Sequence, residues 1–332
     1  MKVARSILKG HCPNAAVVDV AAQVFDRSIG AAEIALMGVP RSYSEKFTLS
    51  RLADLVERLG LDSTAWRVDR LPLPDSGAPL FAQVERRQRH EFVLVTQACA
   101  DWVLSYSGHD GWVLESRLGF EHDFTGFCLA LADRSGLDPA SATDVGLSIM
   151  SAVEMRLVRG FASPDECAEL IDVARPAFRR SMVSADGSLH SGTYSNSRTS
   201  KTAACSGEVC DRFIGRASDT VGVSARYFED VQCVKYGEGD RFSPHFDAPA
   251  VSGQRPSPRE WTMLVYLNDD FEGGETFFPL LDLSVRPETG AMLVFRNKSG
   301  DGSVNGCSLH AGSPVSRGIK YACNIWCADG EN

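Results

Sequence analysis

The chain has 332 residues, of which 44% are hydrophobic and 23% are charged, and its formal net charge is −9. This is an ordinary globular composition with room for two domains. No basic stripe stands out, which argues against nucleic acid as a partner. No apolar run is long enough for a membrane span, so no membrane partner is expected either. The ten cysteines show no zinc-like spacing and the N-terminus no signal-peptide core, so we expect a cytoplasmic protein with reduced thiols.

The first third of the chain alternates between helical and strand patterns. Residues 15–25 carry apolar side chains at a helical period, and residues 48–61 carry a clearer apolar stripe that ends at a glycine. Residues 90–98 and 101–108 read as two strands joined by a short turn. Residues 111–131 continue with a strand, a polar break and another strand. This mixture predicts an α+β domain.

A stretch rich in Gly, Asp, Ser and Pro at residues 133–144 is typical of a linker. It divides the chain into a domain at 1–132, a linker at 133–150 and a domain at 151–332. The second domain opens with a helix. Its signals are Ser163 as N-cap, Pro164 at the first helical position and Glu166 three residues after the cap.

Beyond about residue 190 the pattern changes to short β-type runs separated by Gly, Pro and Asp turns. The clearest runs are residues 231–237, 261–268, 290–297 and 321–327. Many short strands with helices in front of them predict a β-rich sandwich or barrel.

A stretch between the first two of these runs carries a candidate metal site. In the stretch KYGEGDRFSPHFDAP (residues 235–249), one phenylalanine separates His245 from Asp247, and His310 is the only later histidine. On an extended strand, residues i and i+2 point to the same face. Two imidazoles and one carboxylate suit Fe(II) and leave coordination positions open, whereas a structural zinc site needs four protein ligands. A His-x-Asp triplet alone also arises by chance in many proteins.

A lysine in an apolar strand supports the hypothesis of an Fe(II) site. Lys320 stands ten residues after His310, at the start of the run IKYACNIW. A lysine that points into a β-rich core is costly unless an anion pairs with it. The alternative is an outward-facing lysine in solvent.

Residues 153–326 resemble the prolyl 4-hydroxylase branch of the Fe(II)/2-oxoglutarate dioxygenases. The matching stretches, in the order and spacing of that family, are SRTS (197–200), VKYGEGDRFSPHFD (234–247), REWTMLVYLNDDFEGGETFFP (259–279), VRPETGAMLVFRN (285–297) and SLHAGSPVSRGIKYACNIW (308–326). The resemblance implies a double-stranded β-helix, which is a jelly-roll of two sheets with bracing helices on one face.

The resemblance also implies roles for individual residues. Three side chains would hold the iron: His245, Asp247 and His310. Six more would form the cosubstrate pocket: Lys320, Tyr236, Tyr266, Thr262, Asn268 and Trp326. Among these, Lys320 would bind the distal carboxylate of 2-oxoglutarate, and Tyr266 could add a hydrogen bond to it. Even spacing would place Thr262 and Asn268 on the face of Tyr266, and a structural role for Trp326 remains open. The GGET stretch (273–276) predicts a turn with close backbone approach.

The reaction implied by this family consumes 2-oxoglutarate and O2, releases succinate and carbon dioxide, and hydroxylates an unactivated C–H bond at Fe(II). The expected substrate is a peptide or protein residue, with proline as the first candidate. Ascorbate is a possible further requirement, and the sequence leaves the oligomeric state open.

Residues 1–132 resemble the papain-like cysteine peptidases that remove double-glycine leaders from bacteriocin precursors. Cys12, which opens a predicted helix, would match the nucleophile, and His90 would match the base. Three positions depart from the family. Ser107-Gly108 replaces Asp-Pro, Ser6 replaces the oxyanion glutamine, and Pro13 follows the cysteine in place of glycine. We therefore expect a degenerate peptidase that serves as a peptide-binding module. An active leader protease fused to a tailoring oxygenase, or a simple packing scaffold, are the alternatives.

Overall fold

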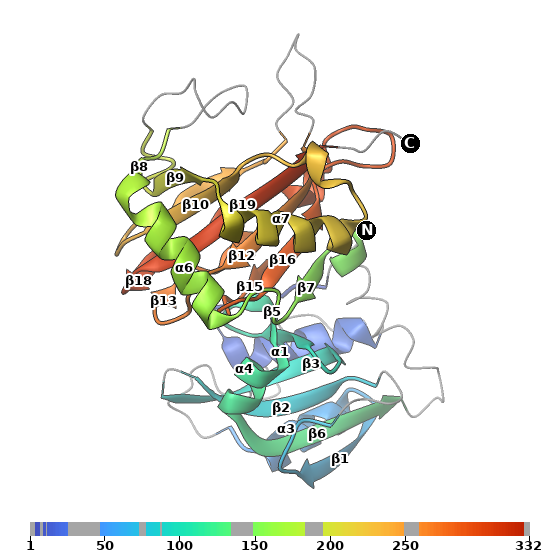
Figure 1. Ribbon diagram of the computed structural model, residues 1–332. Helices are drawn as coiled ribbons and strands as arrows, with labels where there is room; N and C mark the ends of the chain where they lie inside the picture. The colour runs from blue at the N-terminus through green and yellow to red at the C-terminus, as the bar shows by residue number, and fades with distance from the viewer. Residues whose placement is uncertain are drawn as a thin grey trace. The chain divides into compact units, whose positions relative to one another are not determined.

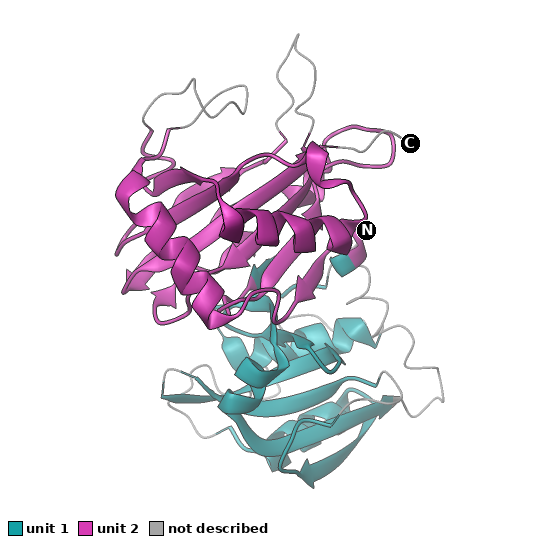
Figure 2. Ribbon diagram, viewed as in Figure 1, with its two compact units in different colours: residues 1–150, 281–284 teal, residues 151–280, 285–332 magenta. Residues whose placement is uncertain are grey.

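The computed structural model describes residues 4–6, 9–10, 12–25, 47–72, 78–86, 88–133, 149–182, 195–248 and 259–328. The chain divides into two compact units, residues 1–150 with 281–284 and residues 151–280 with 285–332 (Figure 2). Most of the predicted linker, residues 134–148, lies outside the described residues. Within the described residues, no helix has the length and apolar character that a membrane crossing requires.

Unit 1 is built on an antiparallel sheet with the strand order β1-β6-β2-β3-β4-β5 (Figure 1). Its strands are β1 (Leu61–Arg67), β2 (Leu80–Arg86), β3 (Arg89–Ala98), β4 (Trp102–Ser107), β5 (Gly111–Ser116) and β6 (Phe124–Asp133). The two strands predicted at residues 90–98 and 101–108 are β3 and β4, and they pair as expected.

Three helices accompany this sheet: α1 (Pro13–Val24), α3 (Leu49–Arg58) and α4 (Arg117–Asp123). Helix α1 is apolar almost all round and is nearly completely buried. Such a helix gains its stability from packing on all sides rather than on one stripe. Helix α3 has the predicted stripe, with Leu52 and Leu55 buried, and Thr48 caps it by accepting a hydrogen bond from the backbone N–H of Arg51.

The larger sheet of unit 2 has the strand order β7-β16-β12-β19-β10-β9-β8. These strands are β7 (Arg156–Val158), β16 (Met292–Arg296), β12 (Arg259–Tyr266), β19 (Lys320–Ala328), β10 (Val231–Tyr236), β9 (Lys201–Cys205) and β8 (Arg179–Arg180). All four β-type runs predicted after residue 190 form strands of this sheet. Their register places Thr262 opposite Trp326 and Tyr236 opposite Lys320.

A smaller set of strands completes the jelly-roll of unit 2. In it β17 (His310–Gly312) pairs with β14 (Thr276–Phe278) on one side and with β11 (Phe242–His245) on the other. Strands β13 (Glu272–Gly273) and β18 (Val315–Arg317) form a separate pair, and the grouping into units divides β15 (Leu283–Val285). The fold is the predicted α+β fold with a C-terminal jelly-roll.

Helices α6 (Pro164–Ala174) and α7 (Glu208–Val221) cover one face of the larger sheet (Figure 1). They pack with the sheet into one apolar core, to which α6 contributes Leu170 and α7 contributes Phe213. The predicted capping box of α6 is present, because Ser163 and Glu166 exchange both of its hydrogen bonds. Short 3₁₀ turns lie at η1 (Arg175–Ala177), η2 (Ala225–Tyr227) and η3 (Gly306–Ser308). With this face of the sheet covered, a pocket remains between the sheet and the smaller strands.

Candidate metal centre and cosubstrate pocket

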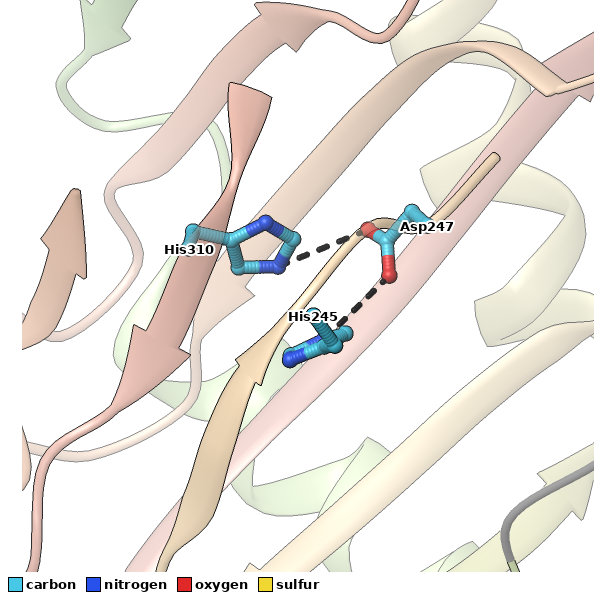
Figure 3. Close-up of side chains that lie close together, drawn as sticks. All are labelled: His245, Asp247 and His310. Atoms are coloured by element: carbon cyan, nitrogen blue, oxygen red, sulfur yellow. Dashed lines mark ion pairs between the residues drawn. The ribbon is translucent and has the colours of Figure 1, made fainter. Parts of the chain in front are cut away.

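Two histidines and one aspartate converge where β11 and β17 pair (Figure 3). His245 is the last residue of β11 and lies opposite His310, the first residue of β17. The Nε2 atom of His245 is 3.5 Å from Oδ1 of Asp247, and the Nε2 atom of His310 is 3.7 Å from Oδ2 of the same carboxylate. One ligand atom from each of the three side chains lies within 4.8 Å of the other two. A single ion can therefore bind all three.

The local structure that positions Asp247 in this site differs from the predicted strand. Strand β11 ends at His245, and Asp247 lies in the bend that follows it. The alternation of side chains along one strand therefore does not bring the two residues together. Cross-strand pairing places the histidines side by side, and the bend turns Asp247 back towards them.

Hydrogen bonds orient both imidazoles for metal binding. The Nδ1 atom of His245 lies 2.9 Å from the carbonyl oxygen of Ser243, and the Nδ1 atom of His310 lies 2.9 Å from that of Ser308. Because a carbonyl oxygen can only accept, Nδ1 carries the proton in each ring, and the lone pair of Nε2 faces the other ligands.

The protonation states also suit a divalent cation. Burial, reinforced by the neighbouring His245, lowers the pKa of His310 to about 4, so this ring is neutral near pH 7. Burial alone would raise the pKa of Asp247. The nearby imidazoles and the Trp326 indole outweigh burial and hold that pKa well below its ordinary value. One anionic and two neutral donors are the set that Fe(II) oxygenase sites use.

Two side chains of the larger sheet fix the Asp247 carboxylate by donating hydrogen bonds to its Oδ2 atom. The Thr262 hydroxyl donates at 2.7 Å and the Trp326 indole N–H at 3.1 Å. The Asn297 amide in turn donates to the Thr262 hydroxyl at 2.8 Å, which directs the hydroxyl proton to Asp247. Thr262 and Trp326, both predicted to form the cosubstrate pocket, thus contact an iron ligand, and Trp326 also lines the pocket.

Arg259 holds the same region and was not among the predicted site residues. Its guanidinium makes two hydrogen bonds of 2.7 Å with the Glu229 carboxylate and lies 3.8 Å from the centre of the Trp326 ring. It also donates to the backbone oxygen of Asp247 at 3.3 Å. A buried arginine at the start of an apolar strand is the signal that could have found it, by the argument applied to Lys320.

We predict that Thr262→Val weakens the binding of Fe(II) about tenfold to a hundredfold, a size typical of lost hydrogen bonds to metal ligands. Valine keeps the volume but removes the donor to Asp247 and leaves the Asn297 amide without its acceptor. The check is the iron concentration that gives half-maximal decarboxylation of 2-oxoglutarate. Thr220→Val on α7, where the hydroxyl donates only to the Arg216 backbone, is the matched control. An unchanged iron requirement in Thr262→Val would contradict this role.

A pocket of about 420 Å³ extends from the three ligands to Lys320. Lys320 is 3% exposed, which excludes the solvated alternative. Its ammonium group donates to the backbone oxygen of Gly274 at 2.6 Å and lies 5.4 Å from the ring centre of Tyr236. Burial lowers its pKa to about 8, against the opposing effect of Glu275. A cation beside an empty volume fits the distal carboxylate of a dicarboxylic acid.

The backbone of the GGET stretch (273–276) lies close to neighbouring segments, as predicted. Gly273 and Gly274 have φ angles of +74° and +67°, which favour glycine. A Cβ atom on Gly274 would lie 3.1 Å from Cδ of Lys320, and one on Gly273 would lie 2.4 Å from the backbone oxygen of Pro314. Thr276, to which the sequence analysis gave no role, is buried and lines the pocket.

Of the other predicted pocket residues, Tyr236 lines the cavity, but Tyr266 and Asn268 lie elsewhere. Tyr266 is fully buried and its hydroxyl pairs with that of Thr276 at 2.8 Å, so it supports the pocket wall from behind. Strand β12 ends at Tyr266, so Asn268 does not lie on that strand. The Asn268 amide instead bonds to the backbone of Ile319 and Tyr321 and anchors the start of β19. The prediction that Asn268 lies on the strand of Tyr266 was wrong, and its role in cosubstrate binding stays a prediction.

In unit 1, the orientation of the His90 side chain does not suit the predicted pairing with Cys12. Cys12 is the partly buried N-cap residue of α1. The side chain of His90 is 61% exposed, and its Nε2 atom lies 3.8 Å from the Glu85 carboxylate. The next residue, Glu91, is buried and accepts a hydrogen bond from the Ser107 hydroxyl at 3.1 Å. The inward-facing position at the start of β3 therefore holds a carboxylate, and His90 faces solvent.

Two histidines and an aspartate in a jelly-roll, with a buried lysine in the same pocket, define a non-haem iron oxygenase that uses 2-oxoglutarate. Residues 231–328 match the family model of the 2OG-Fe(II) oxygenase superfamily. Probable prolyl 4-hydroxylase 3 of Arabidopsis thaliana is 31% identical over 195 residues, which cover 52% of this chain and 68% of the plant protein. Prolyl 4-hydroxylase subunit alpha-1 of Homo sapiens is 30% identical over 163 residues, which cover 47% of this chain and 30% of the human protein. The chain belongs to the prolyl 4-hydroxylase branch of the 2OG-Fe(II) oxygenase superfamily.

Solved structures similar to this chain fall into two groups. The viral collagen prolyl hydroxylase of Paramecium Bursaria Chlorella virus-1, in complex with 2OG, is 26% identical with a TM-score of 0.41, and the match covers 52% of this chain and 94% of the viral one. The peptidase domain of Streptococcus ComA is 15% identical with a TM-score of 0.34, and that match covers 40% of this chain and 98% of the peptidase domain.

The protein is thus a dioxygenase that uses Fe(II), 2-oxoglutarate and O2. The residues present fit these groups. The Nε2 lone pairs of the two histidines and the anionic Asp247 are ready to bind a divalent cation. The Lys320 ammonium, which has no carboxylate within ion-pair distance in the described part of the chain, is ready to bind a dicarboxylic acid.

Proposed function

We propose that this enzyme hydroxylates a prolyl residue of a peptide or protein. The observation that carries the proposal is the similarity to prolyl 4-hydroxylases over 68% of the length of the plant relative, together with the complete set of iron ligands and Lys320. In such a reaction 2-oxoglutarate, O2 and the substrate C–H bond become succinate, carbon dioxide and the C–OH group. O2 is the oxidant, and a bound iron would activate it.

The residues of the chain have separate tasks in this proposal. His245, Asp247 and His310 would hold the iron, and Lys320 would hold the far end of 2-oxoglutarate. Apolar side chains of the larger sheet, including Leu264 and Ala322, line the same cavity. They exclude water from the reacting groups, which protects a strongly oxidising centre from side reactions.

The proposed role of unit 1 is to bind peptide without cleaving it. The sequence resemblance of residues 1–132 to peptidases of peptide precursors supports a peptide-binding role. The exposure of His90 and the burial of Glu91 in the inward position argue against a working cysteine–histidine pair. A Cys12→Ala variant should therefore hydroxylate peptides as well as the unaltered enzyme.

The full-length enzyme with Fe(II), 2-oxoglutarate and a panel of proline-containing peptides tests the proposal. We expect a mass increase of one oxygen atom, which fragmentation locates on proline, and release of succinate in equal amount. The same peptides with alanine in place of proline, and the Asp247→Asn variant with the original peptides, are the controls. Hydroxylation of a different residue type, or of a free amino acid alone, would contradict proline as the substrate residue. It would not contradict the assignment to the 2-oxoglutarate oxygenases.

A further inference from the structure

Positive charge dominates the pocket. Five cationic side chains line it, and Asp247 is the single acidic residue among the described residues that do so. The cations are Arg179, Arg180, Arg198, Arg259 and Lys320. This is unexpected in a chain with a formal net charge of −9. The excess requires an explanation because each buried or half-buried cation loses hydration.

Three of the pocket charges are already matched. Arg259 pairs with Glu229 through two hydrogen bonds of 2.7 Å. Lys320 faces the place of the distal carboxylate of 2-oxoglutarate, and Asp247 faces the place of the metal. Arg179 and Arg198 also line the pocket, and neither has a carboxylate partner among the described residues.

Arg198 is half-buried and has only neutral partners. It donates to the Ser200 hydroxyl at 3.3 Å and to the Gln232 side-chain oxygen at 3.1 Å, and its guanidinium lies 4.6 Å from the centre of the Phe242 ring. The iron ligand His245 also stacks on Phe242, at 3.5 Å between ring centres. Arg198 and the iron ligand His245 therefore contact the same aromatic ring. Burial lowers the pKa of Arg198, and the opposing effects of Tyr236 and Asp247 do not offset this.

Arg179 brings a second guanidinium to the same pocket. It is exposed on β8, the edge strand of the larger sheet, and its hydrogen bonds go to the backbone oxygens of Pro176 and Phe178. These neutral acceptors leave the charge available to a ligand. Arg180 lies next to it and lines the same pocket.

We propose that the enzyme selects peptides in which a carboxylate side chain, from Asp or Glu, lies close to the hydroxylated residue, and that Arg179 and Arg198 bind this carboxylate. The inference rests on the proposed peptide substrate. A guanidinium presents a planar fork of N–H donors that matches a carboxylate with two hydrogen bonds. A local positive pocket on an acidic protein attracts an acidic segment and repels a basic one, which gives selectivity as well as affinity.

Direct binding of labelled peptides to the full-length enzyme tests this preference without depending on turnover. One peptide series has a single proline and one glutamate, placed in turn at each nearby position on either side. A second series has glutamine at these positions, and a third has lysine. Fluorescence anisotropy should show that the best glutamate peptide binds about tenfold more tightly than its glutamine counterpart, as expected for a charge-assisted pair. The difference should shrink as salt is added.

Charge-reversal variants then show which residue causes the preference for glutamate peptides. Arg179→Glu should remove the advantage of glutamate and make the lysine peptide bind more tightly than the glutamate peptide. Arg226→Glu, on the exposed turn η2 outside the pocket, changes the net charge equally and should leave the ranking unchanged. Circular dichroism and thermal unfolding would show that both variants fold.

Three outcomes would overturn the acidic preference. They are equal affinity for glutamate and glutamine peptides, no binding of any glutamate peptide, and equal effects of Arg179→Glu and Arg226→Glu. Mass spectrometry of the same peptides keeps the two proposals apart. Tight binding of the glutamate peptide without hydroxylation of its proline would sink the prolyl hydroxylase assignment and leave the acidic preference standing.

Discussion

Asp247→Asn is expected to reduce the turnover of 2-oxoglutarate by about a thousandfold or more, because the metal supplies the oxidising chemistry. Asparagine keeps the shape of the side chain and can still accept the hydrogen bonds of Thr262 and Trp326. It removes the one negative charge among the three ligands and so weakens their hold on a divalent cation. The loss should appear in succinate release both with and without peptide.

Asp219→Asn, at an exposed position of α7, is the matched control and should keep full activity. Circular dichroism and thermal unfolding would show that Asp247→Asn still folds. We expect it to fold, because the variant loses a buried charge and keeps its shape. Turnover within a few-fold of the unaltered enzyme would remove Asp247 from the ligand set and, with it, the iron site described here.

The jelly-roll was predictable because its strands are short apolar runs bounded by turn residues. Runs of this kind became β10, β12, β16 and β19, and the N-cap signals at Ser163 located the start of α6. The iron ligands were also predictable in identity, since few histidines stand in this part of the chain. The geometry was not, because the bend after His245 is a local departure from strand periodicity that residue types do not show.

The surroundings of the metal ligands escaped prediction for a different reason. Whether Thr262 turns its hydroxyl to a cosubstrate or to Asp247 depends on how β12 lies against the bend, a contact between segments distant in sequence. The same holds for Arg259, whose partner Glu229 lies thirty residues earlier. Pairs of this kind follow from the strand order, which the sequence pattern leaves open.

Unit 1 shows how sensitive a site prediction is to register. Side chains alternate along a strand, so an error of one position reverses the face. The resemblance to peptidases placed the base at His90, at the start of the run HEFVLV. In the structure His90 faces solvent and Glu91 is buried against Ser107. The element was therefore located correctly, but the residue that faces inward is the neighbouring one.

Lys320→Met should weaken the binding of 2-oxoglutarate roughly a few hundredfold to a few thousandfold, because it breaks a buried charge pair worth about 3–5 kcal/mol. Methionine fills the same volume without a charge. The check is the dissociation constant of 2-oxoglutarate measured by calorimetry, and Lys298→Met, away from the pocket lining, is the control. Unchanged affinity for 2-oxoglutarate would show that its distal carboxylate binds elsewhere.

The lowered pKa of Lys320 predicts that the affinity for 2-oxoglutarate depends on pH, if Lys320 binds this cosubstrate. In the free enzyme the ammonium group is lost as the pH rises through about 8, whereas an ordinary lysine keeps it to about 10.5. Bound dicarboxylate favours the charged form, so binding should take up a proton above about pH 8 and weaken as the pH rises further. Calorimetry in buffers of different ionisation enthalpy measures this uptake, and Lys320→Met should abolish it.

The same residue should act on stability with the opposite sign. Between about pH 8 and pH 10.5 the unfolded chain holds the proton of Lys320 and the folded chain does not, so this residue makes stability rise with pH across that window. Below pH 8 the folded protein retains a buried cation without an anionic partner, which costs stability in the absence of 2-oxoglutarate. Lys320→Met should therefore unfold at a higher temperature than the unaltered enzyme at pH 7 and lack the rise with pH. A variant that loses cosubstrate affinity and gains stability together would identify Lys320 as a cation kept for its ligand rather than for the fold, whereas a variant that loses both would identify a structural residue.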